Sequence, residues 1–170
     1  LHMQLIEIDK TRYRKHLRIV FAAIAVALAI IAIGSSTLII HCFSTPDADH
    51  FWHNLAGVII AAIIVAITLN KLRSHPFMSE VVYVWDLKQQ LNRIHRKLKN
   101  IEQMIENNDH DAMAIMNYMY KGSKQLSELD DNTITMTTLN SKIRALDKMM
   151  QDTGLDTSTD SFSPDMLDKF

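Results

Sequence analysis

Apolar residues gather in two long runs near the start of the chain and recur at regular intervals after them. The first run, 17–40, reads LRIVFAAIAVALAIIAIGSSTLII, and the second, 51–72, is centred on LAGVIIAAIIVAITL behind an aromatic flank. A helix rises about 1.5 Å per residue, so about 20 residues cross a hydrocarbon core of about 30 Å. The pattern predicts transmembrane helices over 17–40 and 51–72, joined by a short loop within 41–54.

After Pro76 the pattern changes to amphipathic helix. Apolar positions three and four residues apart predict helices over about 77–107, 111–129 and 133–152, within a helical domain covering 76–153. Gly154 is suited to the position that follows a helix, and the polar stretch after it predicts a mobile tail over 154–170. The fold class expected is all-α: a two-helix transmembrane hairpin followed by a helical bundle or coiled-coil-like domain.

The first of these helices carries a regular apolar seam, typical of a coiled coil or a long bundle helix. Because it is longer than the other two, part of its seam is expected to lack a partner within the chain. Pairing with another subunit is the preferred interpretation, and a monomer with a bent first helix is the alternative. The seam consists of Val84, Leu87, Leu91, Ile94, Leu98, Ile101 and Ile105.

The end of the chain contains a second small apolar group. Phe162, Met166, Leu167 and Phe170 follow Ser163 and would share one face of a helical turn. They form either a docking peptide or, as we prefer, a frayed terminal turn on the bundle.

Charges beside the two runs predict their orientation. The segment 1–16 is basic, Lys71 and Arg73 follow the second run, and the loop between the runs has acids but no Lys or Arg. By the positive-inside rule both termini are expected in the cytoplasm. The first run is too long for a cleaved signal peptide. The leading Leu1 and His2 are interpreted as a cloning remnant before a natural start at Met3.

Small residues recur four apart in both runs, a spacing that lets helices approach closely in lipid. The alternative is that this spacing arises by chance, since alanine is frequent in both runs. The pairs are Ala25 with Ala29, Gly57 with Ala61, and Ala62 with Ala66.

The outer loop holds the best metal-ligand candidates. His41, Cys42, His50 and His53 offer imidazole and thiolate, which zinc and copper accept. Their spacing matches no defined zinc motif, so a polar hairpin turn is preferred and no cofactor is expected. Cys42 is the chain's single cysteine, which excludes an internal disulfide and leaves an intersubunit one open.

A basic group on the first domain helix suggests an anionic surface or an acidic partner. Nucleic acid is not expected as a partner, because the net charge is −1 and the domain as a whole is not basic. The group consists of Lys88, Arg93, Arg96, Lys97 and Lys99.

No phosphate-binding loop, nucleophile elbow or catalytic triad pattern appears, so the chain is not expected to be an enzyme.

Three stretches of the sequence resemble a bacterial family of small two-span membrane proteins known only as a domain of unknown function. They are IDKTRYRKHL (8–17), FWHNLAGV (51–58) and HPFMSEVVYVWDLKQQLNRI (75–94). The resemblance covers residues 3–150. It implies the bacterial inner membrane and the same hairpin topology, and it implies no activity.

Three functions remain open at this point. The first is a membrane-anchored helical interaction or scaffold protein, homo-oligomeric or with a cytoplasmic protein partner. The second is a small oligomeric channel or transport accessory subunit, although the runs carry no ionisable residue at mid-depth. The third and weakest is a metal or redox sensor built on the outer loop.

Overall fold

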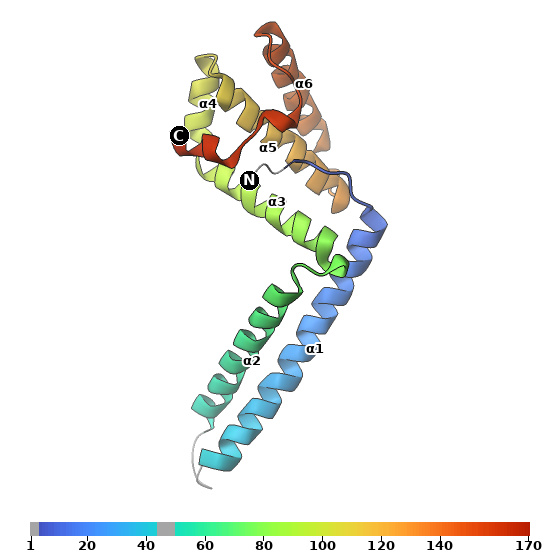
Figure 1. The fold of residues 1–170 in the computed structure, drawn as a ribbon, viewed down its shortest axis with the longest axis vertical. Helices are drawn as coiled ribbons and strands as arrows, with labels where there is room; N and C mark the ends of the chain where they lie inside the picture. Colours follow the sequence, from blue (N-terminus) through green and yellow to red (C-terminus); the bar gives the residue numbers. More distant parts are fainter. Residues whose placement is uncertain (1–3, 44–49) are drawn as a thin grey trace. The chain divides into compact units, whose positions relative to one another are not determined.

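The computed structural model describes residues 4–43 and 50–170, and all regular structure in these ranges is helical (Figure 1). The all-α class is therefore confirmed. The described chain forms two compact units, called here the hairpin (Thr11–Val82) and the helical domain (4–10 with 83–170). The elements are α1 (Lys10–Phe43), α2 (Phe51–Leu72), η1 (Pro76–Met78), α3 (Ser79–Arg96), α4 (Leu98–Glu106), α5 (His110–Leu129), α6 (Met136–Asp152), η2 (Thr159–Ser161) and η3 (Pro164–Lys169).

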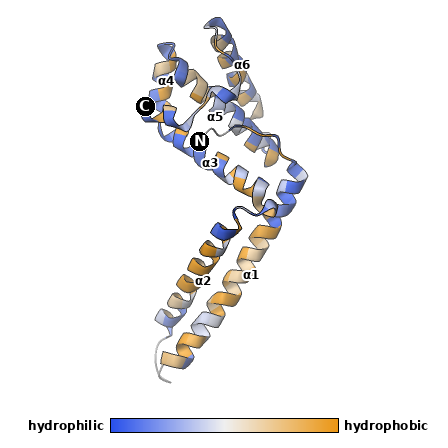
Figure 2. Cartoon of the chain, in the orientation of Figure 1, coloured by the Kyte–Doolittle hydropathy of each residue, from blue (hydrophilic) through white to orange (hydrophobic). Residues whose placement is uncertain are grey.

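The hairpin consists of two helices that are long and apolar enough to cross a membrane. α2 covers the same residues as the second predicted span, whereas α1 begins at Lys10, so part of the basic N-terminal segment is already helical. Hydrophobic residues colour most of both helices, apart from the hydrophilic N-terminal part of α1 and the ends of α2 (Figure 2), and large apolar side chains such as Ile33 and Trp52 are about 70% exposed. Such apolar surface is unusual for a helix surrounded by water.

The connection after α2 follows the sequence prediction in part. Pro76 starts the short helix η1, where its missing N–H and fixed φ are tolerated. The Nδ1 atom of His75 accepts a hydrogen bond from the Phe77 backbone N–H at 3.1 Å and caps this turn. The long helix predicted over 77–107 is instead divided into η1, α3 and α4.

Lys97 separates α3 from α4, because its backbone leaves the helical region at φ −108° and ψ 6°. Its side chain donates a hydrogen bond to the carbonyl oxygen of Leu167 at 2.5 Å, and Asn100 donates one to the Phe170 carbonyl at 3.0 Å. The bend lets both halves of the predicted helix pack against α5. The sequence pattern continues through Lys97 without a glycine or proline, so it contains no sign of this break.

The predicted seam is covered by the same chain. Val84, Leu87, Leu91, Ile94 and Ile101 are buried, and Leu98 and Ile105 pack against the core that most of them form with α5, α6 and the C-terminal segment. Gly122 of α5 permits the close approach of α3, since a Cβ there would lie 3.2 Å from Leu87 and Leu91 side-chain atoms. The seam residues are therefore covered within one chain, on a helix that is bent at Lys97. Pairing with another subunit stays a prediction.

α5 lies at the centre of the helical domain. Its residues from Ala112 to Tyr118 are all buried, and α4, α6, η2 and η3 contact it. Asp109 caps its start by accepting a hydrogen bond from the Ala112 N–H at 2.9 Å. This bond, together with the positive charge of Lys169, holds the pKa of Asp109 below its ordinary value, although burial raises it.

The segment 154–170, predicted as a mobile tail, packs on the domain. Gly154 ends α6 with a φ of +74°, as its position suggested. Beyond it, Phe162 is 1% exposed and stacks on Tyr118 with ring centroids 4.2 Å apart, and Leu167 is equally buried. Asn117 donates to the Thr157 carbonyl at 2.9 Å, and Lys169 reaches Asp111 at 2.6 Å. The partners lie on α5 and its cap, far away in sequence, so the polarity of the tail did not reveal them.

The N-terminal segment before α1 also belongs to the helical domain. The Ile6 N–H donates to the Tyr83 hydroxyl oxygen at 3.1 Å, and Gln125 donates to the Ile6 carbonyl at 2.6 Å. Lys10 forms an ion pair with Asp131. Residues that precede the first apolar helix are thus held by residues that follow the second one.

Candidate functional site

The two hairpin helices meet where α2 has no side chain. A Cβ on Gly57 would lie 2.8 Å from both the Ala32 carbonyl oxygen and the Ser36 nitrogen, so only glycine allows this contact. Ala61, one turn further, is fully buried. The Ser36 hydroxyl donates a hydrogen bond to the Asn54 side-chain oxygen across the same contact.

Of the three small-residue pairs in the sequence, only Gly57 with Ala61 forms the contact between α1 and α2. Ala25, Ala29, Ala62 and Ala66 are exposed. The spacing alone did not distinguish these pairs, because all three place small residues at the same interval; the glycine of one pair is what allows the close contact.

The Gly57 contact is directly testable. Gly57→Ala should destabilise the α1–α2 pair by about 1–3 kcal/mol, because the added methyl group meets helix backbone that cannot rotate away. Thermal unfolding of the full chain in detergent micelles, followed by circular dichroism, measures the loss. Gly34→Ala is the matched control, since nothing lies within 4 Å of a Cβ at that position. Equal stability of the two variants would contradict the contact.

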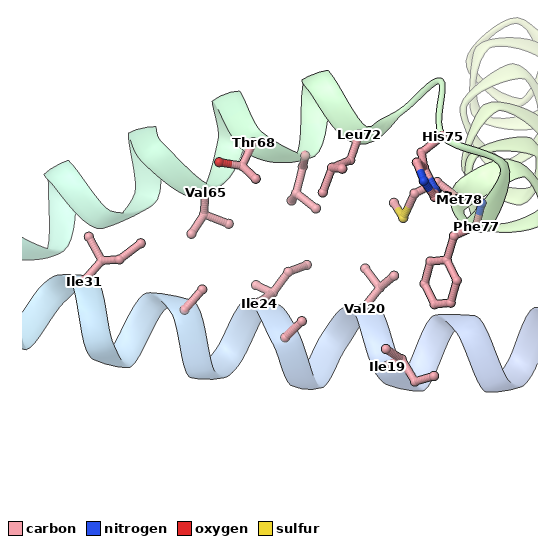
Figure 3. Close-up of a pocket in the computed structure, with 13 residues that line it drawn as sticks. Ile19, Val20, Ile24, Ile31, Val65, Thr68, Leu72, His75, Phe77 and Met78 are labelled. Atoms are coloured by element: carbon pink, nitrogen blue, oxygen red, sulfur yellow. Dashed lines mark hydrogen bonds between the residues drawn. The ribbon is translucent and has the colours of Figure 1, made fainter.

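A groove of about 440 Å³ opens between α1 and α2 away from this contact (Figure 3). Its walls are almost entirely hydrocarbon. The one hydroxyl, that of Thr68, donates to the Ile64 carbonyl at 2.8 Å in its own helix. The lining comes from α1 (Ile19, Val20, Ala23, Ile24, Ala27, Ile31), α2 (Val65, Thr68, Leu69, Leu72) and the connection that follows (His75, Phe77, Met78).

A polar cluster adjoins the end of the groove formed by Phe77. The His16 ring stacks on Phe77 with centroids 4.1 Å apart, and its Nδ1 lies 3.4 Å from Glu80 Oε2 without hydrogen-bond geometry. Arg12 Nε lies 2.9 Å from Glu80 Oε1, and the Ser79 hydroxyl donates to Glu80 at 3.0 Å. Three residues, Arg12 and His16 from α1 and Ser79 from the start of α3, therefore surround one carboxylate.

Glu80 stays ionised in this setting. Burial raises the pKa of its carboxyl group, but hydrogen bonds from its own backbone N–H and from Ser79, together with the positive charge of Arg12 and the nearby His16 ring, outweigh burial, so the pKa lies below its ordinary value. A carboxylate with a lowered pKa suits charge pairing better than proton transfer at neutral pH. We interpret the cluster as an ion pair that joins α1 to the start of α3.

The metal-ligand candidates in and beside the loop 41–54 are only partly brought together. His41 and Cys42 lie exposed in the last turn of α1, whereas His50 precedes α2 and His53 lies in its first turn. The rings of His50 and His53 are edge to face with centroids 6.0 Å apart. Within 4–43 and 50–170, no three His, Cys, Asp or Glu side chains are grouped closely enough for a metal ion. The loop acids Asp47 and Asp49 lie outside the described residues.

The basic group of the first domain helix is divided by the bend. Lys88 pairs with Asp130 at 3.2 Å and Lys97 is bound to the C-terminal segment. Arg93, Arg96 and Lys99 remain exposed. The group is therefore a dispersed set of surface charges, two of which stabilise the domain.

Sequence reasoning missed the groove and the Glu80 cluster. Arg12 and His16 lay within the basic segment 1–16, and no motif singled out Glu80. Their meeting depends on how the chain returns after α2, which no local pattern encodes. Glu80 lies in the first turn of a helix, a position that favours an acid but gives no sign of burial.

Comparison with known proteins bears directly on the family resemblance. The chain matches the profile of a family described as "Protein of unknown function (DUF3087)" over residues 3–167. No curated protein and no solved structure gives a significant match. The match extends beyond residue 150 into the C-terminal segment, where the sequence resemblance had ended. The chain therefore belongs to the DUF3087 family.

Proposed function

We propose that this chain is an integral membrane protein whose hairpin anchors a folded helical interaction domain at the inner surface of the bacterial cytoplasmic membrane. The exposed apolar surface of α1 and α2 supports the anchor. In lipid, these side chains need no protein cover, and every backbone hydrogen bond is satisfied within each helix.

The observation that best supports the proposal is that the helical domain binds the N-terminal segment by hydrogen bonds and an ion pair. Ile6 is hydrogen-bonded to Tyr83 and Gln125, and Lys10 pairs with Asp131. Segments before α1 and after α2 that belong to one folded unit must lie on the same side of the membrane, so the chain between them crosses it an even number of times. Two crossings, by α1 and α2, satisfy this requirement.

Charge supports a cytoplasmic place for that unit. Cations crowd the N-terminal part of α1 and follow α2, whereas the connection at the other end of the hairpin has no Lys or Arg. Phe43, Phe51 and Trp52 are exposed at that other end. Aromatic side chains there suit the outer membrane–water interface.

Exposed apolar side chains support an interaction role for the helical domain. Trp85 is 60% exposed on α3 and Ile134 is 90% exposed before α6, and exposed aromatic residues often anchor protein partners. Self-association through the seam is a weaker proposal, because its residues are already covered within one chain. An ion channel is a weaker proposal, because the space between the two spans is lined by hydrocarbon rather than by polar groups.

Labelling of cysteines by a membrane-impermeant thiol reagent tests the topology. Cys42 is the single native cysteine and is exposed at the end of α1, so it should react in cells whose outer membrane is permeable but whose inner membrane is intact. The matched variant Cys42→Ser with Asn92→Cys moves the thiol to an exposed position on α3. It should react only after the inner membrane is lysed.

Two results would contradict the proposal. Labelling of both thiols in cells whose inner membrane is intact would place the helical domain outside. Release of the wild-type chain from membranes by alkaline carbonate would show that the hairpin does not anchor it. A reversed pattern, with only Asn92→Cys labelled, would invert the orientation.

A further inference from the structure

We propose that the groove between α1 and α2 is a binding site for one acyl chain of an anionic glycerophospholipid from the cytoplasmic leaflet. This inference rests on the proposed membrane anchor. It adds a specific ligand, which the anchor by itself does not require.

The shape of the groove suits a single hydrocarbon chain. On α1 the lining extends from Ile19 to Ile31, which is about 18 Å of helix, close to one leaflet of a core about 30 Å thick. The far end is closed because α1 and α2 touch at Gly57 beyond Ile31. The near end is bordered by His75, Phe77 and Met78 (Figure 3).

The width of the groove argues against a helix as its occupant. A volume of about 440 Å³ over about 18 Å corresponds to a mean cross-section on the order of 25 Å². An α-helix with its side chains is about 10 Å across and needs on the order of 80 Å². An extended alkyl chain is far thinner, so a lipid tail fits better than a second copy of α1 or α2.

The chemistry of the walls selects hydrocarbon. Thr68 supplies the one hydroxyl among the lining side chains of α1 and α2, and it is already bonded to Ile64. A polar ligand would lose its hydration in this groove without gaining hydrogen bonds from these walls, which costs free energy. An acyl chain has no polar groups, so it loses no hydrogen bonds to water when it enters the groove.

Charges at the open end select an anionic headgroup. Arg18 and Lys71 directly precede the lining residues Ile19 and Leu72, both are exposed, and neither has an ion-pair partner within the described ranges. The one buried acid nearby, Glu80, is already paired with Arg12. The open end therefore carries excess positive charge at the depth where phosphate groups lie, as in basic lipid sites between transmembrane helices.

Native mass spectrometry of the full chain in detergent, with added phosphatidylglycerol or phosphatidylcholine, tests the site. Wild type should retain one phosphatidylglycerol in preference to phosphatidylcholine by roughly 30-fold, at about fivefold for each of two cations. Arg18→Gln with Lys71→Gln should abolish the preference. The charge-matched control, Lys99→Gln with Lys148→Gln, alters exposed lysines of the helical domain and should leave it unchanged.

Filling the groove tests the tail-binding part. Ala27→Phe should remove the retained lipid, because Ala27 lines the groove, whereas Ala29→Phe on the exposed side of α1 should not. Equal retention of both lipids, or no difference between these two variants, overturns the site. Dimers that exclude lipid and are lost in Ala27→Phe also overturn it, in favour of a second copy.

Carbonate extraction of the same variants separates this inference from the anchor. Variants that stay in the membrane but show no lipid preference overturn the lipid site alone. A wild-type chain released by carbonate overturns the anchor, and the lipid site with it.

Discussion

Phe162→Ala should destabilise the helical domain by about 3–5 kcal/mol, the usual cost of removing a buried aromatic side chain. Phe162 is 1% exposed and stacks on Tyr118 in the core, so the substitution leaves a cavity beside α5. Urea unfolding of the full chain in a mild detergent, followed by circular dichroism, measures the difference in free energy of unfolding.

Ile134→Ala is the control for this experiment. Ile134 is also a large apolar residue of the helical domain, but it is 90% exposed, and its loss should change stability by about 0.5 kcal/mol or less. If Phe162→Ala behaves like Ile134→Ala, the C-terminal segment is mobile, as its polar sequence suggested. A large difference shows that residues after Gly154 are part of the domain.

Ile94→Ala should destabilise the helical domain by about 2–5 kcal/mol, and by the same amount at every protein concentration. Ile94 is fully buried in the core that α3 forms with the rest of the domain. The measurement is urea unfolding at protein concentrations that differ by about 100-fold. Its neighbour His95 is exposed on the same helix, so His95→Ala should have little effect.

Dependence on concentration distinguishes the two interpretations of the seam. A seam that pairs with another subunit stabilises the wild type more as concentration rises, by mass action. In that case Ile94→Ala would also lower the oligomeric mass measured by light scattering. A constant stability difference with an unchanged mass supports a seam that is buried within one chain.

The expectations that held best depend on composition over many residues. Two apolar runs of membrane length predict long helices without regard to their neighbours, and α2 begins at Phe51 and ends at Leu72, as its run does. The caps are also local: Pro76 starts a turn and Gly154 follows a helix because of their own backbone preferences. These features follow from interactions within a few residues.

The bend at Lys97 and the packed C-terminal segment are different in kind. Each depends on partners far away in sequence: Lys97 binds the Leu167 carbonyl, and Phe162 stacks on Tyr118. The apolar repeat through α3 and α4 correctly marks which side chains are buried. It does not say what buries them, since a seam covered by another subunit and a seam covered by the same chain have the same spacing.

The sequence by itself determined the all-α class, the two apolar helices and the buried seam of α3 and α4, because hydrophobicity and helical period are local properties. Only the tertiary structure decided which small residues touch, where the seam finds its cover, and that Arg12, His16 and Glu80 meet beside an apolar groove. Those outcomes depend on Gly57 bringing two helices together and on the return of the chain after α2. Contacts between residues so far apart are set by the packing of the whole unit.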